Sequence, residues 1–482
     1  MALTNPVLGS PTASAGTERS RPAFGGRASW WGDVAGGVGI LLVVAVLALW
    51  VRDGGLSTLA DPGGVAIATG RVTGLVASAL LLIQILLMAR IPWVERAWGQ
   101  DMLTRRHRLV GILSFYLMLG HVVAITIGYA QAGRSALLAE FWSLVTTYPG
   151  MLLATAGTVA LIVVVATSIR AARRRLRYES WHLIHLYAYL GAGLALPHQL
   201  WTGADFLSST AATVLWWGLW ASAAVSMLLF RLVRPVVRSL YHRVVVTQIR
   251  QEAAGLVSVV LGGRRLDRLR LSPGQFCHWR FLTGTGWTRA HPFSISSVPT
   301  ADRLRITFAL DGDDGRRLAG IRPGTRVLVE GPFGRLTAAV RSRRDVLLIG
   351  AGVGVTPLRA LAEQIVGEAA APGPGGSRPP SVVLLQRASR PDAILFAAEF
   401  AVLAQHHHLR VVPMIGHRGS EVAWLPPPLS ADPEGSLTGL VPDVNDREVY
   451  LCGPSPWMDS VFGTLRRVGV GAGAVHREEF AW

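Results

Sequence analysis

The chain has 482 residues, half of them hydrophobic, and a formal net charge of +17. A chain of this length is expected to form several domains, and one this apolar is not an ordinary soluble protein. The positive charge does not indicate nucleic-acid binding, because much of the excess arginine lies between apolar segments and no basic face with interleaved aromatic residues is visible.

Six apolar segments in the first half are long enough to cross a lipid bilayer, which takes about 17 to 25 helical residues. The predicted spans are 34–51, 72–90, 109–130, 150–169, 182–201 and 209–230. We therefore expect an all-α, six-helix transmembrane domain over residues 34–235. Residues 1–33, rich in Ser, Thr, Gly and Pro, are expected to be a disordered cytoplasmic N-terminus.

The arginines between the spans predict the orientation of the chain. Five lie in 90–108, between the second and third spans, and five in 170–177, between the fourth and fifth, whereas the alternate loops carry few. Short cytoplasmic loops are enriched in positive charge. Both termini are therefore expected in the cytoplasm, in a multi-pass protein of the cell membrane whose third and fifth spans run outward.

Four histidines lie in or directly before the third and fifth apolar segments, His107 with His121 and His185 with His198. In a helix, 14 steps make nearly four turns, so the first pair shares a face, with a rise of roughly 21 Å between the two residues. The second pair is about 140° off a common face, so we expect an irregularity near Pro197. A lone histidine could be a satisfied core residue, but four at matched depths predict metal ligands, and two stacked bis-histidine haems.

The second half changes to shorter segments. From residue 239, alternating apolar and polar positions between turn residues predict a small antiparallel β-barrel over 239–340. From residue 345, strands alternate with helices, which predicts an α/β, doubly wound parallel sheet over 341–482. With only two cysteines, Cys277 and Cys452, we expect no structural disulfide and no iron–sulfur cluster of the chain's own.

A glycine-rich turn follows the first strand of the predicted parallel sheet. Gly350, Gly352 and Gly354 would let the backbone approach a pyrophosphate, and the helix from Thr356 would offer free amides and the positive end of its dipole. The turn is not the G-x-G-x-x-G fingerprint, and an ordinary tight turn is the alternative.

Two arginines follow the second strand, where an NAD site of the fingerprint type has an acidic residue. Arg387 and Arg390 would suit a 2′-phosphate and favour NADPH, with solvated loop arginines as the alternative. In the predicted barrel, HPFSISSVP (291–299) offers Phe293 as a flat face for a flavin ring and Ser294 as a hydroxyl for a ring nitrogen. A buried strand with a capping serine would give the same pattern.

Taken in order, the histidines and five motifs resemble the NADPH oxidase and ferric reductase superfamily from about residue 70 to the C-terminus. The motifs are HPFSISSVP, EGPFG, GAGVGVTP, LCGP (451–454) and HREEF (476–480). The resemblance implies a six-helix haem domain with two b-type haems, an FAD barrel and a nicotinamide domain of the ferredoxin–NADP reductase type. It also implies the ligand pairs His107 with His185 and His121 with His198.

The resemblance further implies residues for each nucleotide cofactor. FAD would be held by His291, Pro292, Phe293 and Ser294, with the histidine where soluble relatives usually have arginine. The nicotinamide dinucleotide would be held by Gly350, Gly352, Gly354, Thr356 and Pro357. Its nicotinamide end would meet Cys452, Gly453 and Pro454. Phe480 would pack near the flavin, with Trp482 as a competing candidate, and the usual hydroxyl for the FAD pyrophosphate is not evident around DGDDGRRL, where amides near Gly315 could substitute.

The implied function is electron transfer from cytoplasmic NADPH, with NADH as the alternative donor, through FAD and two haems to an extracytoplasmic ferric chelate or O2. A flavin is expected between the ends of this path, because a nicotinamide gives up two electrons and haem iron accepts one. A second interpretation passes the electrons to a membrane or extracytoplasmic partner protein or to quinone. A third is a non-catalytic redox sensor.

Overall fold

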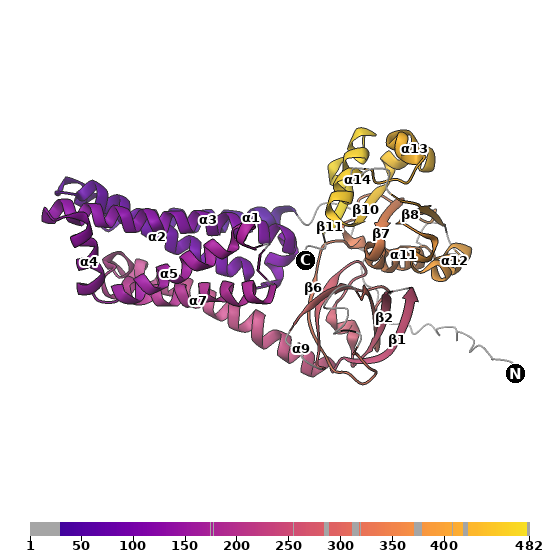
Figure 1. Cartoon of the computed structure of the whole chain (residues 1–482), viewed down its shortest axis with the longest axis horizontal. Helices are drawn as coiled ribbons and strands as arrows, with labels where there is room; N and C mark the ends of the chain where they lie inside the picture. Colours follow the sequence, from indigo (N-terminus) through magenta and orange to yellow (C-terminus); the bar gives the residue numbers. More distant parts are fainter. Residues whose placement is uncertain are drawn as a thin grey trace.

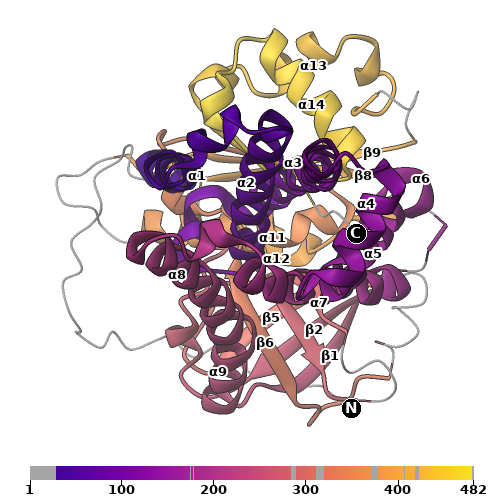
Figure 2. The ribbon, with the colours of Figure 1, turned by 90° about the vertical axis from the view of Figure 1, so that its left-hand side faces the viewer.

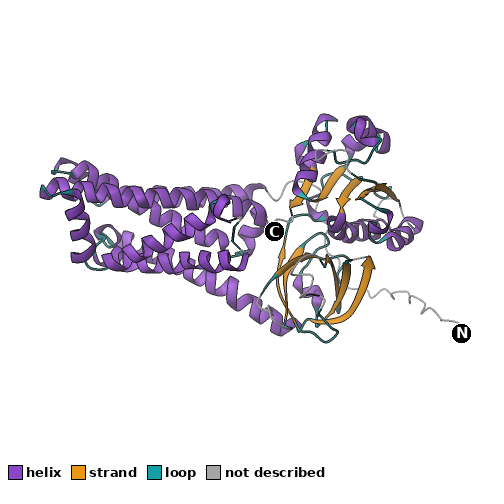
Figure 3. Ribbon diagram, viewed as in Figure 1, coloured by secondary structure: helices purple, strands orange, loops and turns teal. Residues whose placement is uncertain are grey.

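The computed structural model describes residues 29–479 apart from 174, 177, 254, 284–288, 311–317, 319, 371–377, 407 and 418–422. A long helical half lies beside a half made of two smaller lobes (Figure 1). Strands occur only in the two lobes among the described residues, as the colouring in Figure 3 shows. The change of architecture follows the change in sequence pattern near residue 239.

The helical half contains α1 (Ser29–Arg52), α2 (Gly64–Met88), α3 (Pro92–Gly133), α4 (Leu137–Thr147), α5 (Met151–Ser168), α6 (Arg170–Arg173) and α7 (Tyr178–Trp201). Five described segments are long and apolar enough to cross a membrane: Gly32–Arg52, Gly64–Met88, Met102–Gly133, Met151–Ser168 and Thr210–His242. The chain is therefore a multi-pass membrane protein. The expected span 182–201 is helical, as α7, but is not one of these five.

Glycines bring the helices of the bundle together. Viewed end-on in Figure 2, α2 and α3 lie side by side, as do α5 and α7. A Cβ added at Gly157 of α5 would lie 2.7 Å from the carbonyl oxygen of Gly191 on α7. Small residues allow this approach, which supplies the packing that membrane helices need in place of a hydrophobic driving force.

One continuous helix leads from the bundle to the first lobe. It consists of α8 (Thr210–Ser226), the π-helical segment η3 (Met227–Val233) and α9 (Arg234–His242). In the first lobe, the hydroxyl oxygen of Ser239 accepts a hydrogen bond from the Val329 amide at 3.2 Å. The span expected to end at residue 230 therefore continues for 12 more helical residues, up to His242.

The first lobe contains two three-stranded antiparallel sheets. One has the order β1 (Val245–Ala253), β2 (Leu256–Gly262), β5 (Arg303–Ala309), and the other β4 (His291–Ser294), β3 (Phe276–Phe281), β6 (Val327–Phe333). Isolated antiparallel bridges join Val245 to Arg326 and Ile295 to Ile306. Residues from both sheets, with fully buried Trp279 among them, share one core. The antiparallel pairing agrees with the alternating sequence pattern.

The second lobe has a five-stranded parallel sheet in the order β11 (Val475–Glu479), β10 (Glu448–Gly453), β7 (Val346–Ala351), β8 (Val382–Ala388), β9 (Leu409–Ile415). Apolar residues of α11 (Val355–Ala370) and α12 (Ala397–His406) belong to one core, and those of α13 (Pro433–Leu440) and α14 (Ser455–Arg467) to another. Coverage of both faces explains the continuously apolar strands. The last strand, β11, forms one edge of the sheet beside β10.

A buried ion-pair network joins the two lobes. Arg305 of β5 donates to both carboxylate oxygens of Glu399 on α12, at 2.7 and 2.8 Å. Arg359 of α11 contacts the same carboxylate at 2.7 Å and donates to the Ser296 carbonyl oxygen at 3.0 Å. Both arginine side chains are nearly buried, at 12% and 8% exposed. The network fixes the relative position of the two lobes.

Replacing Glu399 by glutamine should therefore destabilise the contact between the lobes. Arg305 would lose its carboxylate partner, whereas Arg359 would keep its ion pair with Glu363 at 2.5 Å, and breaking a buried pair on one side costs about 3 kcal/mol. Thermal unfolding of the full chain in detergent would measure the loss. Glu434, paired with Arg467 at the surface where the side chains are 38% and 60% exposed, is the matched control. Its replacement by glutamine should cost under about 1 kcal/mol.

The same contact should weaken in acid. Burial raises the pKa of Glu399, but hydrogen bonds from Arg305 and the charges of Arg359 and Arg305 outweigh burial and leave the pKa below its usual value. A carboxyl group whose folded pKa is depressed contributes stability above its unfolded pKa and loses it as the pH falls through the folded pKa. The unfolding temperature should fall below about pH 4, and the Glu399→Gln variant should lose that part of the dependence.

Candidate functional site

His107 of α3 and His185 of α7 face each other inside the helical half. Their ring centroids are 6.0 Å apart and the rings are inclined at 67°. A metal–imidazole bond is about 2 Å long, so two imidazoles on opposite sides of one metal ion have centroids about 6 Å apart. The separation of this pair fits axial ligation of a single metal.

The two histidines of α3 share the face that lies against α2. The Nδ1 atom of His107 is 3.2 Å from the carbonyl oxygen of Gln84, and that of His121 is 2.7 Å from the carbonyl oxygen of Gly70. The acceptors are 14 residues apart on α2, as the histidines are on α3. This spacing confirms the shared face predicted for this pair. Because each Nδ1–H donates to a carbonyl, each Nε2 is the atom that could bind a metal.

His185 has an equivalent arrangement on the opposite helix. Its Nδ1 atom is 3.3 Å from the Ser168 hydroxyl oxygen, which also accepts from Trp181 Nε1 at 3.3 Å. The serine hydroxyl donates its own proton to the carbonyl oxygen of Val164 at 2.7 Å, so it accepts from the histidine. His185 is therefore held as the tautomer that leaves Nε2 available.

The second pair lies deeper in the bundle. His121 and His198 are close enough for an electrostatic interaction. A Cβ added at Gly74 of α2 would lie 2.5 Å from His121 Nδ1, so only glycine leaves this ring its space. The irregularity expected near Pro197 does not interrupt α7, which is helical through Trp201. Side-chain rotamers and the crossing of α3 with α7 can therefore aim the ring of His198 without a break in the helix.

Haem is the metal group that these residues fit. No group of three or more His, Cys, Asp or Glu side chains is arranged to hold a metal among the described residues. A metal bound here would have to bring most of its ligands with it, as haem iron does, since its macrocycle leaves only axial positions to the protein. His107 and His185, which face each other with available Nε2 atoms, would hold such an iron.

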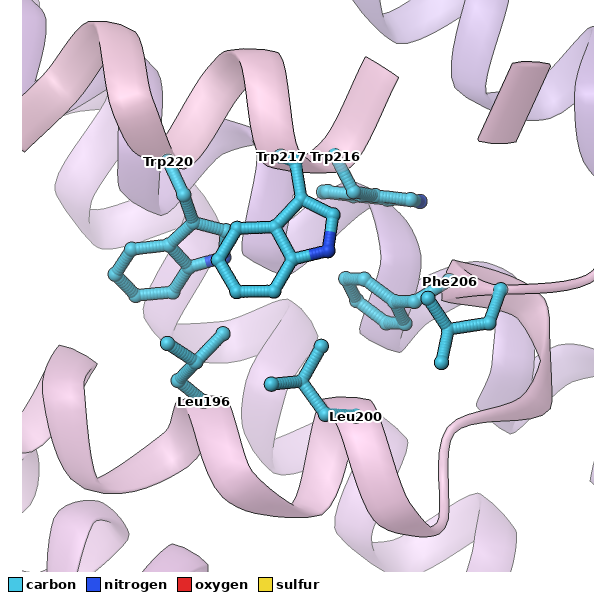
Figure 4. Close-up of a pocket in the computed structure, with 7 residues that line it drawn as sticks. Leu196, Leu200, Phe206, Trp216, Trp217 and Trp220 are labelled. Carbon is cyan, nitrogen blue, oxygen red and sulfur yellow. The ribbon is translucent and has the colours of Figure 1, made fainter. Parts of the chain in front are cut away.

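An apolar pocket opens on the helix that carries His198 (Figure 4). It is lined by Leu196, Leu200, Phe206, Leu207, Trp216, Trp217 and Trp220. The two leucines of α7 lie within one turn of His198, and three tryptophans of α8 form the opposite wall. The Nε1 atom of Trp220 is buried and has no hydrogen-bond partner among the described residues.

The HPFS residues form β4, which pairs with β3 in the first lobe. His291 and Ser294 are buried, and the Phe293 ring stacks on the Phe308 ring with centroids 4.2 Å apart and planes inclined at 9°. The His291 ring stacks on Phe293 at 5.6 Å. Phe293 therefore packs against the core of the lobe and is itself only partly buried.

The three glycines of the turn after β7 serve different steric needs. Gly352 has φ of +55°, a conformation that other residues adopt rarely, and has open space beside it. A Cβ at Gly350 would lie 2.8 Å from Leu358, and one at Gly354 would lie 2.3 Å from the carbonyl oxygen of Cys452. Gly350 and Gly354 are thus tightly packed against the protein, whereas Gly352 has open space beside it. Such space is what the approach of a pyrophosphate to the backbone requires.

Thr356 lies at the start of α11, where the first amides of the helix lack intrahelical partners. Its side chain is 2% exposed, and its hydroxyl oxygen is buried with no hydrogen-bond partner among the described residues. An orphaned hydroxyl beside free helix amides fits a phosphate ligand. Pro357 follows in the first turn, where its missing N–H costs nothing.

The end of β10 brings Cys452 beside β11. The thiol is buried and lies 3.8 Å from the carbonyl oxygen of Glu478. Burial, and then the charge of Glu478, raises the pKa of Cys452 well above its usual value, so the thiol is neutral. A Cβ at Gly334, in VEGPFG of the first lobe, would lie 2.3 Å from the Glu478 carboxylate. Both lobes therefore meet at the place expected for the nicotinamide end, next to Gly453 and Pro454.

Glu478 is a site residue that the sequence argument did not assign. The signal was present in HREEF, where a carboxylate precedes the aromatic residue by two positions.

Phe480 itself, Trp482 and the DGDDGRR segment around Gly315 lie outside the described residues. The structure separates the two predicted phosphate ligands: Arg387 is 6% exposed and donates to the Met414 carbonyl oxygen at 3.2 Å, whereas the Arg390 side chain is 65% exposed beside Asp392.

Comparison with known proteins divides the chain in the same way. Residues 73–196 match the family model of the ferric reductase like transmembrane component. The ferredoxin reductase component of 3-ketosteroid-9-alpha-monooxygenase from Mycolicibacterium smegmatis is 30% identical over 235 residues, which is 48% of this chain and 62% of that protein. The chain thus spans about three-fifths of this relative.

Two further proteins are similar over about half of the chain. The electron transfer subunit of dihydroorotate dehydrogenase B (NAD(+)) from Shouchella clausii is 27% identical over 251 residues, covering 48% of this chain and 85% of that subunit. The solved FAD/NAD binding domain of nitric oxide dioxygenase from Vibrio cholerae is 24% identical, with a TM-score of 0.40, and covers 50% of this chain and 98% of that one.

Proposed function

Since the chain combines a ferric reductase-like transmembrane domain with a ferredoxin reductase-like half, as in the ferric reductase and NADPH oxidase superfamily, we propose a function in transmembrane electron transfer. Cytoplasmic NADPH is the donor, and FAD and two b-type haems carry the electrons to an extracytoplasmic ferric chelate or O2. The proposed domains are the transmembrane haem domain at 34–235, the FAD barrel at 239–340 and the nicotinamide domain at 341–482.

The 6.0 Å separation of the His107 and His185 rings is the observation that carries this proposal. His107 lies near the start of α3, which contacts the first lobe through Ala97, whose carbonyl oxygen accepts from Arg335 at 3.2 Å. His121 lies about 21 Å further along the helix. The first pair would hold the haem nearer the flavin lobe and the second pair the haem nearer the far side.

The chain's own residues would position the carriers and exclude water. A flavin, when bound, exchanges two electrons with a nicotinamide and single electrons with haem iron. Gly352, the amides of α11 and the hydroxyl of Thr356 would hold the dinucleotide phosphates. Cys452, neutral and buried, would shape an apolar surface for the nicotinamide, and Glu478 would close the site against the first lobe.

The reduced-minus-oxidised absorption spectrum of the purified protein tests the proposal. NADPH added without air should reduce FAD and two b-type haems, and air or ferric citrate should then reoxidise them. The acceptor that reoxidises the haems faster would distinguish an oxidase from an iron reductase. A flavin spectrum without haem would refute the histidine assignment.

Arg390 should set the preference for NADPH. Its guanidinium is exposed and pairs only at the surface with Asp392, at 3.3 Å, so it could exchange this partner for a 2′-phosphate. Arg390→Ala should then raise the KM for NADPH about tenfold and leave the KM for NADH nearly unchanged, as a single charged hydrogen bond predicts. Steady-state reduction of an artificial electron acceptor would measure both constants. An equal change for both nucleotides would contradict the assignment.

A further inference from the structure

The helix that leads out of the bundle keeps an exposed apolar face up to its last turn. The face consists of residues at i, i+3, i+4 and i+7, which lie on one side of a helix: Val233, Val236, Val237 and Leu240. Their exposed fractions rise from 40% at Val233 to 70% at Leu240. Arg238 lies on the other side of α9, where its guanidinium donates to the Gly331 carbonyl oxygen of the first lobe. The apolar face is thus turned away from the lobe.

The end of this helix lies at the level of the lipid headgroups. With 33 residues, Thr210–His242 is long enough to cross a bilayer together with both headgroup layers, about 40 to 45 Å in all. The first lobe is held at the same level, because Arg90, which directly follows α2, forms a close ion pair with Glu330 on β6. In Figure 1, α9 leaves the bundle obliquely, with the first lobe along one side. The apolar face of α9 therefore lies where lipid can cover it.

A basic loop is fixed beside the end of the helix. The segment GRRLDRLR (263–270), here called the basic loop, follows β2 and contains four arginines and one aspartate. The Arg264 amide donates to the His242 carbonyl oxygen at 2.7 Å, and the His242 Nδ1 atom is 3.0 Å from the Arg264 carbonyl oxygen. Arg238 of α9 also donates to the Leu269 carbonyl oxygen at 3.3 Å. These bonds hold the basic loop beside the last turn of α9.

The arginines around the helix end are exposed and lack anionic partners. Five of them are exposed: Arg243 directly after α9, and Arg264, Arg265, Arg268 and Arg270 in the basic loop. Arg265 and Arg268 donate to the Tyr241 hydroxyl oxygen at 3.2 and 3.3 Å. Within the described part of the chain, none of the five has a carboxylate at ion-pair distance. With Asp267 as the one carboxylate of the loop, the surface is strongly positive.

Three of these arginines also have an unfavourable backbone conformation. The φ angle is +46° at Arg243, +48° at Arg265 and +52° at Arg270, in the left-handed region that favours glycine. Glycine at these positions would relieve the backbone but would remove the charge. Strained conformations of this kind gather at sites that bind ligands, which fits a use for the three side chains.

We propose that the basic loop and Arg243 bind the phosphate groups of anionic phospholipids in the leaflet next to the first lobe. Guanidinium groups match phosphate oxygens in a two-pronged geometry. Tyr241 joins the two parts of the surface, since it follows Leu240 of the apolar face and accepts from two arginines, and tyrosine is enriched at membrane interfaces. A nucleic acid or free phosphate would use the charges alone, whereas a lipid also covers the apolar face. The assignment goes beyond electron transfer and does not depend on it.

Lipid binding by the full-length chain in detergent tests this proposal. Delipidated protein would be titrated with phosphatidylglycerol and with phosphatidylcholine of the same acyl chains, and bound lipid would be counted by native mass spectrometry. Each basic residue near a membrane surface strengthens the attraction for anionic lipid about fivefold. Replacing Arg264, Arg265 and Arg268 together by glutamine should therefore raise the Kd for phosphatidylglycerol at least about tenfold and change the Kd for phosphatidylcholine less than about twofold. Lysine at the same three positions keeps the charges and should largely restore phosphatidylglycerol binding.

Arg378, Arg410 and Arg467, three exposed arginines of the second lobe, provide the matched control. Their joint replacement by glutamine should change the Kd of neither lipid. Equal loss of phosphatidylglycerol binding in the two glutamine variants would overturn the proposal, because total charge would then decide binding. Unchanged binding in the basic-loop variant would also overturn it. Displacement of phosphatidylglycerol by inorganic phosphate, or tighter binding of a single-stranded oligonucleotide to the same arginines, would assign the surface to a free anion or to nucleic acid instead.

Discussion

Alanine in place of His107 should remove one of two haems, and alanine in place of His185 should remove the same one. The two rings are spaced for one metal, so loss of either imidazole leaves that iron with a single axial ligand from the protein. The pyridine haemochrome absorbance per chain should fall by half in each single variant. The double variant should lose no more, because its two sites act on one haem.

The pairing also predicts which haem survives. His121→Ala combined with His107→Ala should leave no bound haem, whereas His107→Ala with His185→Ala should leave the one near His198. NADPH should fail to reduce that surviving haem, since the carrier nearer the flavin lobe is missing. Complete haem loss in the His107→Ala, His185→Ala variant would show that the two histidines do not share an iron.

Valine in place of Gly74 should remove the haem near the far side of the bundle. A Cβ at this position would lie 2.5 Å from His121 Nδ1 and 2.9 Å from its Cε1. The ring would have to turn away, which would break its hydrogen bond to the Gly70 carbonyl and misdirect Nε2. Overpacking of this kind costs about 1 to 3 kcal/mol, so the helices should still assemble while the haem content falls by half.

Gly120→Val is the matched control for this substitution. Gly120 precedes His121 on α3, is exposed at the helix surface, and has no neighbouring atom within 4 Å of an added Cβ. Both changes put the same β-branched residue into a long apolar helix. Equal haem loss in the two variants would mean that helix stability, and not the space for the His121 ring, controls haem binding.

The structural features that could be predicted from the sequence are those that depend on a single helix or strand. The 14-residue spacing of His107 and His121 fixes a shared face in any straight helix, and the structure has it. The irregularity expected near Pro197 does not interrupt α7. Ring direction depends on rotamers and helix crossing as well as on spacing, and neither can be predicted from the sequence of one helix. The burial of Arg387 was also not predictable, since the carbonyl oxygen of Met414 to which it donates comes from a neighbouring strand.

Contacts between distant segments were beyond prediction for the same reason. Nothing near Arg90 in the sequence indicates Glu330, and the partner becomes visible only when β6 is placed against the end of α2. The helix through His242 was also missed, because Arg231, Arg234 and Arg238 end the apolar pattern without ending the helix. Apolar composition indicates which part of a helix lies in the membrane. The backbone hydrogen bonds of this helix continue beyond that part.

The uninterrupted helix from Thr210 to His242 connects the membrane-spanning part of the chain directly to the first lobe. Thr210–His242 has 33 residues and measures about 50 Å, well beyond the roughly 30 Å of hydrocarbon. No loop separates its membrane part from the end that bonds to Val329 in β6. A spanning helix longer than the hydrocarbon layer is accommodated by tilting, among other ways, and a tilt of this helix would move the end that bonds to the first lobe.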